Sequence, residues 1–183
     1  MIRVRATAAL LLVFCVSANV IQADEPFRSL IERLEHPLWT ARQDAALALG
    51  ANGPIAATAI PALSDVLGDA NVQVRRAAVQ ALVEVAGGSE AAVPGLVRAL
   101  ADVDWVVRRR AAVSFEHFDG ADAVGEIRKL LGNESTDVRT SAALALSGLA
   151  PHSVAALPEL VDALGDADWQ LRAAAAHALG ALG

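Results

Sequence analysis

One pattern recurs along the chain and constrains its fold more than any other feature. An apolar residue directly precedes an arginine, an alanine follows the arginine three residues later, and further apolar residues follow at helical spacing. Each arginine therefore lies near the start of a predicted amphipathic helix. These arginines, which are 33, 33, 31 and 33 residues apart, are Arg42, Arg75, Arg108, Arg139 and Arg172.

A second helix is predicted upstream of each arginine. It is marked by two apolar residues four positions apart, which share one face of a helix. The pairs are Leu30 and Leu34, Leu63 and Leu67, Leu96 and Leu100, Ile127 and Leu131, and Leu160 and Leu164. Hydrophobic residues make up 55% of the chain and aromatic residues only 4%, and this small aliphatic content favours packed helices over a sheet. The predicted fold class is all-α.

One helix pair in every 31 to 33 residues predicts a stacked array. A single pair cannot bury its apolar face without a neighbour, so each unit depends on the next. Tetratricopeptide and ankyrin repeats have similar lengths, but their signatures are absent from this sequence. Prolines near the start of the upstream helices predict a first turn or a bend there, and Asp104 and Asp168 are predicted N-caps of downstream helices.

Three units share a longer motif. A proline is followed eight residues later by an acid, and six residues further on by the arginine; the sets are Pro61, Asp69 and Arg75, then Pro94, Asp102 and Arg108, then Pro158, Asp166 and Arg172. In this motif the chain resembles HEAT repeats, specifically the short HEAT-like units named for phycobilisome lyases. The resemblance covers residues 26–183 and implies a right-handed α-α superhelix of about five repeats. Their approximate bounds are 26–52, 53–87, 88–119, 120–150 and 151–183.

The resemblance also implies a structural ladder between successive repeats, built from acids and arginines. The expected rungs pair Asp69 with Arg75, Asp102 with Arg108 and Asp166 with Arg172, while the acid position before Arg139 holds Asn133. A row of arginines could instead bind anions. We favour the structural role, because the arginine of each of these three rungs has an expected acidic partner six residues upstream.

The first 23 residues have the layout of a secretory signal peptide. Arg3 and Arg5 precede an apolar run over 6–16, and cleavage after Ala18 or Ala23 would leave a small residue last. The run is too short for a confident membrane span, although an uncleaved anchor is the alternative. The single cysteine, Cys15, lies in this segment, so the predicted mature chain has no thiol for disulfides or nucleophilic chemistry.

Charge argues against a nucleic-acid partner. The chain has 15 basic and 21 acidic residues, and removing Arg3 and Arg5 leaves 13 against 21, a formal charge of −8. Phosphate backbones are bound by clustered lysines and arginines, and the dense basic cluster here is confined to Arg108, Arg109 and Arg110. The predicted partner is therefore a protein.

No catalytic, metal or cofactor site is predicted. Glu116, His117 and Asp119 have residue types suited to acid-base chemistry, but adjacent positions of a helix face different directions. The four histidines are separated along the chain and none belongs to a paired metal motif. Some HEAT-like enzymes, the deoxyhypusine hydroxylases, bind iron through paired His-Glu motifs. This sequence has no His-Glu dipeptide, so that activity is not expected here.

Two irregular features have open interpretations. Trp39, Trp105 and Trp169 share one register, three residues before their arginines, and could line a peptide or glycan site. We favour a wedge against the preceding unit, because indole is large and amphipathic. In the third unit Phe115 replaces a leucine and Phe118 follows three residues later. This departure indicates either a functional site or two rings that fill a gap left by small neighbouring residues. We favour gap filling.

Candidate contact positions follow from register, because in HEAT-like arrays the downstream helices usually line the concave surface. The predicted partner-binding residues are Arg76, Arg109, Arg110, Gln80, Val113, Glu116 and His117. The same surface is expected to include Gln43, Thr140, Leu47, Leu144 and His177. Its centre is positive, which predicts an acidic segment in the partner. The apolar last helix, over residues 171–183, predicts self-association or a longer array.

The sequence thus predicts an exported, non-catalytic scaffold for protein–protein interaction without a cofactor. The alternative is an enzyme or enzyme accessory resembling phycobilin lyase subunits, with a small ligand on the concave surface. Fold alone does not choose between them, since repeat scaffolds serve many functions.

Overall fold

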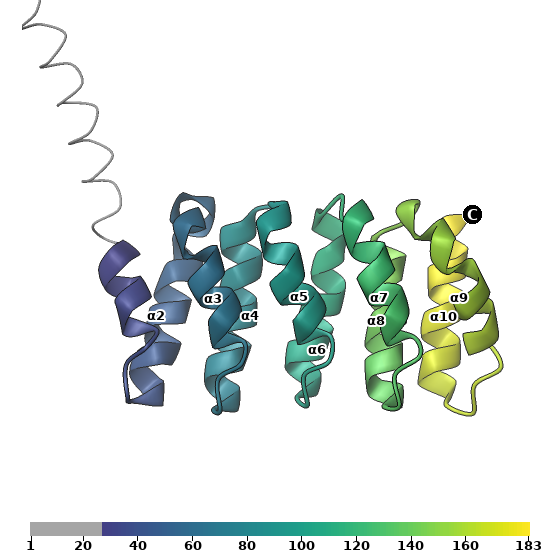
Figure 1. Cartoon of the computed structure of the whole chain (residues 1–183), viewed down its shortest axis with the longest axis horizontal. Helices are drawn as coiled ribbons and strands as arrows, with labels where there is room; N and C mark the ends of the chain where they lie inside the picture. The colour runs from purple at the N-terminus through teal and green to yellow at the C-terminus, as the bar shows by residue number, and fades with distance from the viewer. Residues whose placement is uncertain (1–26) are drawn as a thin grey trace, which may run out of the picture.

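The protein is a single row of stacked helix pairs (Figure 1). The computed structural model describes residues 27–183, which contain helices and turns and no strand, so the all-α prediction is confirmed. The predicted signal peptide over residues 1–23 lies outside the described residues. No helix within 27–183 has both the length and the apolar character needed to cross a membrane.

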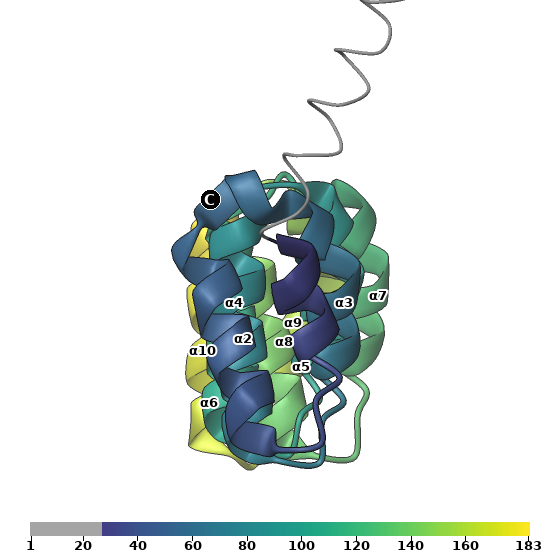
Figure 2. The same cartoon turned by 90° about the vertical axis from the view of Figure 1, so that its left-hand side faces the viewer.

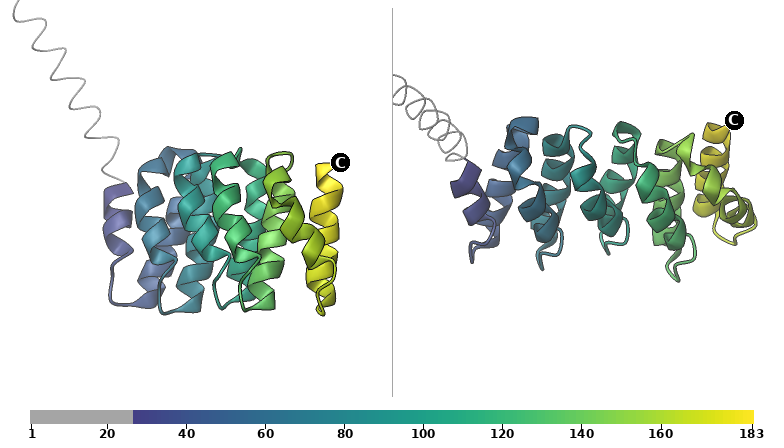
Figure 3. Two further views of the ribbon diagram at one scale, coloured as in Figure 1. Left: turned by 45° about the vertical axis from the view of Figure 1, so that its right-hand side comes forward. Right: turned by 45° about the horizontal axis from the view of Figure 1, so that its top comes forward.

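The helices form two layers. The first layer holds residues 27–33 and the helices α3 (Ile60–Val66), α5 (Val93–Ala99), α7 (Val124–Leu130) and α9 (Leu157–Ala163). The second layer holds α2 (Trp39–Ala51), α4 (Val72–Ala86), α6 (Trp105–Ser114), α8 (Thr136–Gly148) and α10 (Trp169–Leu182). Figure 2 shows the layers as two columns, and Figure 3 shows the pairs following one another from residue 27 to the C-terminus. We call the outer surface of the second layer the second-helix face.

Short 3-10 segments connect many of these helices. They span Gly53–Ala59, Glu90–Ala92, Phe115–His117, Ala121–Ala123 and His152–Ala156. Pro61, Pro94 and Pro158 are each the second residue of an α-helix that follows such a segment, where a missing N–H costs no helical hydrogen bond. The expected first turn with a bend before it is confirmed.

Aspartates begin two of the second-layer helices as predicted. The side chain of Asp104 accepts hydrogen bonds from the N–H groups of Val106 and Val107, at 3.1 and 3.2 Å. Asp168 accepts from Gln170 and Leu171 at 2.8 and 3.1 Å. Each carboxylate satisfies N–H groups that the helix itself leaves without a partner, so these caps fix where α6 and α10 begin.

The core is one continuous apolar cluster between the two layers. The leading residues of the predicted pairs Leu63, Leu96, Ile127 and Leu160 are fully buried, whereas Leu164 is 41% exposed. Small residues bring neighbouring helices into close contact. A Cβ on Gly50 of α2 would lie 2.9 Å from the Cα of Ala81 in α4, closer than such atoms approach.

A ladder of ion pairs joins successive repeats, but its pairing differs from the sequence prediction. Arg42 donates from Nε to Asp69 at 2.6 Å, and Arg75 donates from Nε to Asp102 at 2.8 Å. Arg139 in turn donates to Asp166 at 2.9 Å. Each arginine therefore pairs with the acid 27 residues downstream, in the next repeat, and not with the acid six residues upstream.

The residue six positions before each ladder arginine contributes its main-chain carbonyl oxygen to the ladder. Arg75 Nη1 donates to the carbonyl oxygen of Asp69, while one carboxylate oxygen of Asp69 accepts the N–H of Asn71. The aspartate side chain is thus turned towards the preceding repeat. The sequence predicted that the side chains pair as Asp69 with Arg75, Asp102 with Arg108 and Asp166 with Arg172. These side-chain pairs are wrong. Each arginine does lie beside the expected aspartate, but it donates to the main-chain carbonyl oxygen of that residue. Arg172 is exposed and has no acidic partner among the described residues.

The two phenylalanines of the third unit belong to the core. Phe115 is fully buried, Phe118 is 7% exposed, and their ring centroids are 6.1 Å apart. Helix α6 ends before Phe115, about one turn earlier than the other second-layer helices end, and the main chain of Phe115 lies close to Gly148 of α8. This geometry supports the gap-filling interpretation over a binding site.

Candidate functional site

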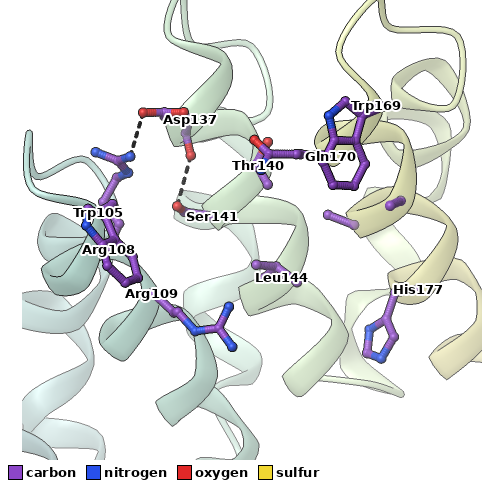
Figure 4. Close-up of a pocket in the computed structure, with 12 residues that line it drawn as sticks. Trp105, Arg108, Arg109, Asp137, Thr140, Ser141, Leu144, Trp169, Gln170 and His177 are labelled. Atoms are coloured by element: carbon purple, nitrogen blue, oxygen red, sulfur yellow. Dashed lines mark hydrogen bonds and ion pairs between the residues drawn. The ribbon is translucent and has the colours of Figure 1, made fainter.

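A groove of about 520 Å³ opens on the second-helix face. It lies across three neighbouring helices of the second layer, α6, α8 and α10, and Figure 4 shows the residues around it. We call it the tryptophan groove. It is lined by Trp105, Arg108, Arg109, Asp137, Thr140, Ser141, Leu144, Trp169, Gln170, Ala173, Ala174 and His177.

Two tryptophan side chains flank this groove. Trp105 is 62% exposed and Trp169 is 66% exposed, although indole is one of the side chains that gains most from burial. Each ring belongs to the first residue of its helix, directly after the aspartate cap, so the helix itself cannot cover it. The helix between them, α8, begins with Thr136 in the same register, so its first residue adds no third indole to the groove.

The favoured expectation for these tryptophans is wrong. A ring wedged against the preceding repeat would be largely buried, and Trp105 and Trp169 are mostly exposed. Trp39 is less exposed, at 42%, and does not line this groove. The alternative, in which the indoles line one side of a binding site, agrees with the geometry of Trp105 and Trp169.

The polar groups of the groove are of two kinds. Arg108 and Asp137 form an ion pair at 2.6 Å, and Ser141 donates to the carbonyl oxygen of Asp137, so these groups satisfy one another. Arg109 is exposed and makes no hydrogen bond or ion pair with any described residue. Figure 4 shows its guanidinium extending from α6 towards α8 on the side of Leu144 that faces α6, with the ring of His177 on the α10 side. Arg109 therefore gives the groove a positive charge that is unpaired within residues 27–183. The floor of the groove is apolar and includes Leu144.

A smaller groove of about 180 Å³ lies on the other side of α6, against α4. Four of the predicted contact residues line it: Gln80, Arg110, Val113 and His117. Arg110 is exposed and, like Arg109, pairs with no group in residues 27–183. Glu84 also lines this groove, where its carboxylate accepts a hydrogen bond from Gln80 at 3.1 Å.

Two predicted contact residues have structural partners. Arg76 forms two hydrogen bonds with Asp104 of the next repeat, at 2.9 and 2.6 Å, so its guanidinium is held in an ion pair, and its part in partner binding stays a prediction. This pairing with Arg76 holds the pKa of the Asp104 carboxyl below its ordinary value. Glu116 is exposed but its main chain packs on α8, since a Cβ on Gly148 would lie 2.9 Å from the Glu116 nitrogen.

The polar residues after α6 do not assemble into one unit. Asp119 Oδ1 lies 2.9 Å from Nε2 of His152, at the start of the fifth repeat, whereas His117 faces the small groove beside α4. Among residues 27–183 no group of three histidine, cysteine or acidic side chains is arranged to hold a metal ion.

Comparison with protein families places the chain. A family model described as HEAT repeats matches residues 27–116 and again 93–180, which together span all five helix pairs. The chain belongs to the HEAT repeat family. A search of curated protein sequences finds no match.

Solved structures of other helical repeat proteins resemble this HEAT repeat protein. The complex of CpcE and CpcF of phycocyanin lyase from Nostoc sp. PCC7120 is 27% identical, with a TM-score of 0.62, over 84% of this chain and 63% of that one. A designed armadillo repeat protein in complex with the peptide (KR)4 is 22% identical, with a TM-score of 0.53, over 84% and 80%. An engineered protein is 24% identical, with a TM-score of 0.56, over 86% and 79%.

The tryptophan groove lies on packed helices of the HEAT array rather than on loops. Its walls are second-layer helices, and α8 contacts both α6 and α10. Sites built on packed helices are held more precisely than sites built on loops.

Proposed function

We propose that this HEAT repeat protein is a non-catalytic scaffold that binds an extended segment of a protein partner in the tryptophan groove. The observation that carries the proposal is the combination of two mostly exposed indoles with an arginine, unpaired within the described residues, around a space of about 520 Å³. Tryptophan and arginine are the residues that most often dominate binding energy at protein interfaces.

The charge of the groove supports an acidic segment. Asp137 is neutralised by Arg108, which leaves Arg109 as the net charge of the lining at neutral pH. The whole chain has a formal charge of −6, so this surface differs in sign from the average of the molecule. Such local complementarity sets the orientation and rate of association more than its affinity, which the indoles would supply.

A structural relative supports an extended ligand. The designed armadillo repeat protein described above is in complex with a peptide, (KR)4, and its fold resembles this one. That peptide is basic, whereas the unpaired charge of the tryptophan groove is cationic. We therefore infer a shared mode, a chain laid across stacked helices, with the opposite charge on the ligand.

Panning a random-peptide display library tests this proposal. The wild-type protein is used for selection, and a Trp105→Ala/Trp169→Ala variant removes peptides that bind elsewhere. Both side chains are more than half exposed, so the double variant is expected to fold, as circular dichroism would show. Peptides that bind the wild type and not the variant are expected. If every selected peptide binds both proteins equally, the groove is not the binding site.

A second candidate function rests on the likeness to the CpcE and CpcF complex of phycocyanin lyase. In that interpretation the tryptophan groove would hold a small ligand such as a bilin, and Arg109 would face its carboxylates. The single cysteine of this chain is Cys15, in the predicted signal peptide, so covalent attachment through a thiol is not expected after cleavage. Addition of a bilin to the protein tests this function, since binding in a groove between two indoles would change the absorbance of the pigment.

We also propose that the protein is exported from the cytoplasm and acts in the periplasm or outside the cell. The support is the sequence of residues 1–23, in which Arg3 and Arg5 precede a short apolar run. Expression of the full chain followed by N-terminal sequencing of each cell fraction tests this. A mature terminus at Asn19 or Asp24 in the exported fraction is expected, and an intact terminus in the cytoplasm would contradict export.

Self-association through the last helix pair stays a prediction. Val161 of α9 and Leu164, which directly follows α9, are 54% and 41% exposed, and Arg172 of α10 has no acidic partner among the described residues. An acid and an apolar surface from a second copy would satisfy both features. Sedimentation measurements over a range of concentrations test this, and a monomer at the highest concentration would contradict it.

A further inference from the structure

We propose, on the basis of the scaffold function above, that the partner segment carries two acidic residues about three positions apart, followed by a bulky apolar residue. The first acid would pair with Arg110 and the second with Arg109. The apolar side chain would lie over Leu144, between Trp105 and Trp169.

The first step is that α6 carries two arginines whose guanidinium groups are unpaired. Elsewhere in this layer Arg172 donates to two main-chain carbonyls, and the other arginines are held by aspartates of the next repeat, as with Arg42, Arg75, Arg76, Arg108 and Arg139. Arg109 and Arg110 are exposed and pair with no group in the described part of the chain. Their N–H donors are therefore available to a ligand, and binding would not require an existing ion pair to break.

The second step is that these two arginines face opposite sides of one helix. Consecutive helical residues are rotated by about 100° around the axis, so their side chains diverge. Arg109 lines the tryptophan groove, towards α8, and Arg110 lines the smaller groove, towards α4. Helix α6 is thus a ridge with an available cation on each flank.

The spacing of the acids follows from the width of that ridge. A helix with its side chains is about 10 Å across. An extended chain advances about 3.3 Å per residue. A segment that crosses α6 therefore places carboxylates on both flanks when the acidic residues are about three positions apart. Two adjacent acids would put both carboxylates on one flank or direct them to opposite faces of the strand.

The apolar residue follows from the floor beyond Arg109. Leu144 of α8 lies between the two indoles, and neighbouring packed helices are about 8 to 10 Å apart. The segment reaches this floor about three residues after its second acid. A large apolar side chain there would cover both rings, which are now more than half exposed.

The acidic groups near this path do not oppose the ligand equally. Asp137 in the tryptophan groove is paired with Arg108 at 2.6 Å. Glu84 in the smaller groove accepts a hydrogen bond from Gln80 and has no basic partner within residues 27–183, so it partly offsets Arg110. We therefore expect the contact with Arg109 to be the stronger of the two.

Synthetic peptides test this inference by fluorescence anisotropy. The spaced peptide has a Gly-Ser background with aspartates at positions i and i+3 and phenylalanine at i+6. The adjacent peptide has the same composition with aspartates at i and i+1. The spaced peptide is expected to bind about tenfold more tightly than the adjacent one. Arg109→Gln and Arg110→Gln are each expected to weaken its binding by about three- to tenfold, with the larger loss for Arg109→Gln.

A charge-matched control separates these contacts from long-range attraction. Arg33 is exposed and lies in the first helix, outside both grooves, so Arg33→Gln removes one positive charge without changing the ridge. It is expected to leave peptide binding unchanged. Equal affinities for the two peptides, no binding of either, or equal losses for all three variants would overturn the inference.

These failures are distinct from failure of the scaffold function. If the display selection yields peptides that depend on Trp105 and Trp169 but lack spaced acids, the groove binds a partner of another chemistry. In that case the function stands and the ligand class is wrong. If the selection yields no peptide that depends on the indoles, the function itself fails.

Discussion

Arg108 donates from Nη2 to Oδ2 of Asp137 at 2.6 Å, across the junction between α6 and α8. In neighbouring junctions the acid that accepts from the ladder arginine is 27 residues downstream, but 29 residues separate this pair. The position six residues before Arg139, where other repeats have the aspartate, holds Asn133, which keeps one role of that aspartate by accepting the N–H of Ser135 at 2.9 Å. The other role of the aspartate is to accept a hydrogen bond from the ladder arginine, and Asp137, in the first turn of α8, performs it.

This substitute pair is weaker than its neighbours. The side chain of Asp137 is 64% exposed, whereas Asp69 and Asp102 are each 9% exposed. Water screens the exposed partner and reduces the value of the pair. We predict that Asn133→Asp increases the free energy of unfolding by about 1 kcal/mol, because it restores a charged acceptor beside the buried Arg108. Urea denaturation followed by circular dichroism measures the change.

A double-mutant cycle provides the control for this assignment. Asp137→Ala is expected to cost about 1 kcal/mol in the wild type and less in the Asn133→Asp background, where Arg108 has a second acid. Additive effects of the two substitutions would show that they do not share Arg108 as a partner.

Gly148 marks a close approach between α8 and the end of α6. An alanine Cβ there would lie 2.9 Å from the nitrogen of Glu116 and 3.1 Å from the carbonyl carbon of Phe115, and main-chain atoms cannot easily move away. We expect Gly148→Ala to lower the free energy of unfolding by about 1 to 3 kcal/mol. Thermal and urea unfolding would measure this loss.

Gly180→Ala is the matched control. Gly180 also lies in a second-layer helix, but a Cβ at that position meets nothing within 4 Å. Alanine there is expected to stabilise α10 by up to about 1 kcal/mol through helix propensity. Destabilisation by both substitutions would contradict the assigned role of Gly148.

Phe115 is predicted to be the most costly aromatic side chain to remove. It is fully buried, and its ring is 6.1 Å from that of Phe118. Phe115→Ala should lower the free energy of unfolding by about 3 to 5 kcal/mol, through lost burial and the cavity left behind. Phe115→Leu restores the residue type of the other repeats and should cost less than half as much. A small loss in both variants would argue against a packing role.

The ladder makes stability depend on acidic pH. Hydrogen bonds from Arg42 and Arg76 lower the pKa values of Asp69 and Asp104 in the folded protein. A carboxyl with a lower pKa in the folded than in the unfolded state stabilises the fold above its ordinary pKa of about 3.9. That contribution is lost as the pH falls below this value towards the folded pKa. We predict a constant free energy of unfolding between about pH 7 and 5 and a steep fall below about pH 4.

An Arg42→Gln/Arg76→Gln variant tests the cause of this acid sensitivity. Without the two guanidinium groups, the pKa values of Asp69 and Asp104 should return towards those of the unfolded chain. The variant is then less stable at pH 7 and shows a shallower decline below about pH 4. Parallel curves for the variant and the wild type would contradict the assignment.

The fold was predictable because the same information occurs five times. The spacing of Arg42, Arg75 and the later arginines, with leucines at helical intervals, sufficed to predict helix pairs in a stack. The buried Leu63, Leu96 and Leu160 and the caps Asp104 and Asp168 lie where the pattern indicated. Local spacing determines these features, so they do not depend on how the repeats are placed relative to one another.

Features that depend on the placement of repeats were harder to predict. An aspartate six residues before Arg75 looks like its partner, but the guanidinium binds the carbonyl of that residue and the carboxylate of Asp102. The ion pair of Arg76 was not predicted for the same reason, since its partner Asp104 lies 28 residues away. A pattern within one repeat does not show which repeat supplies the partner.

The tryptophan groove was only partly visible in the sequence. The shared register of Trp105 and Trp169 was a usable signal, and Thr136 at the intervening position was a second one. Together they indicate two indoles on either side of a gap, but exposure of the rings depends on the packing of three helices. Of the residues predicted for the contact surface, Arg109, Thr140, Leu144 and His177 lie in this groove, while Arg110, Gln80, Val113 and His117 gather in the smaller one.

The indole N–H signals of the three tryptophans test the central claim most directly. A ¹H–¹⁵N spectrum of the labelled protein contains one such signal each from Trp39, Trp105 and Trp169, and Trp39 lies outside the groove. On titration with the tightest peptide from the display selection, the signals of Trp105 and Trp169 should shift together while that of Trp39 stays in place. A shift of Trp39 alone, or shifts confined to amides of α3, α5, α7 and α9, would contradict binding in the tryptophan groove.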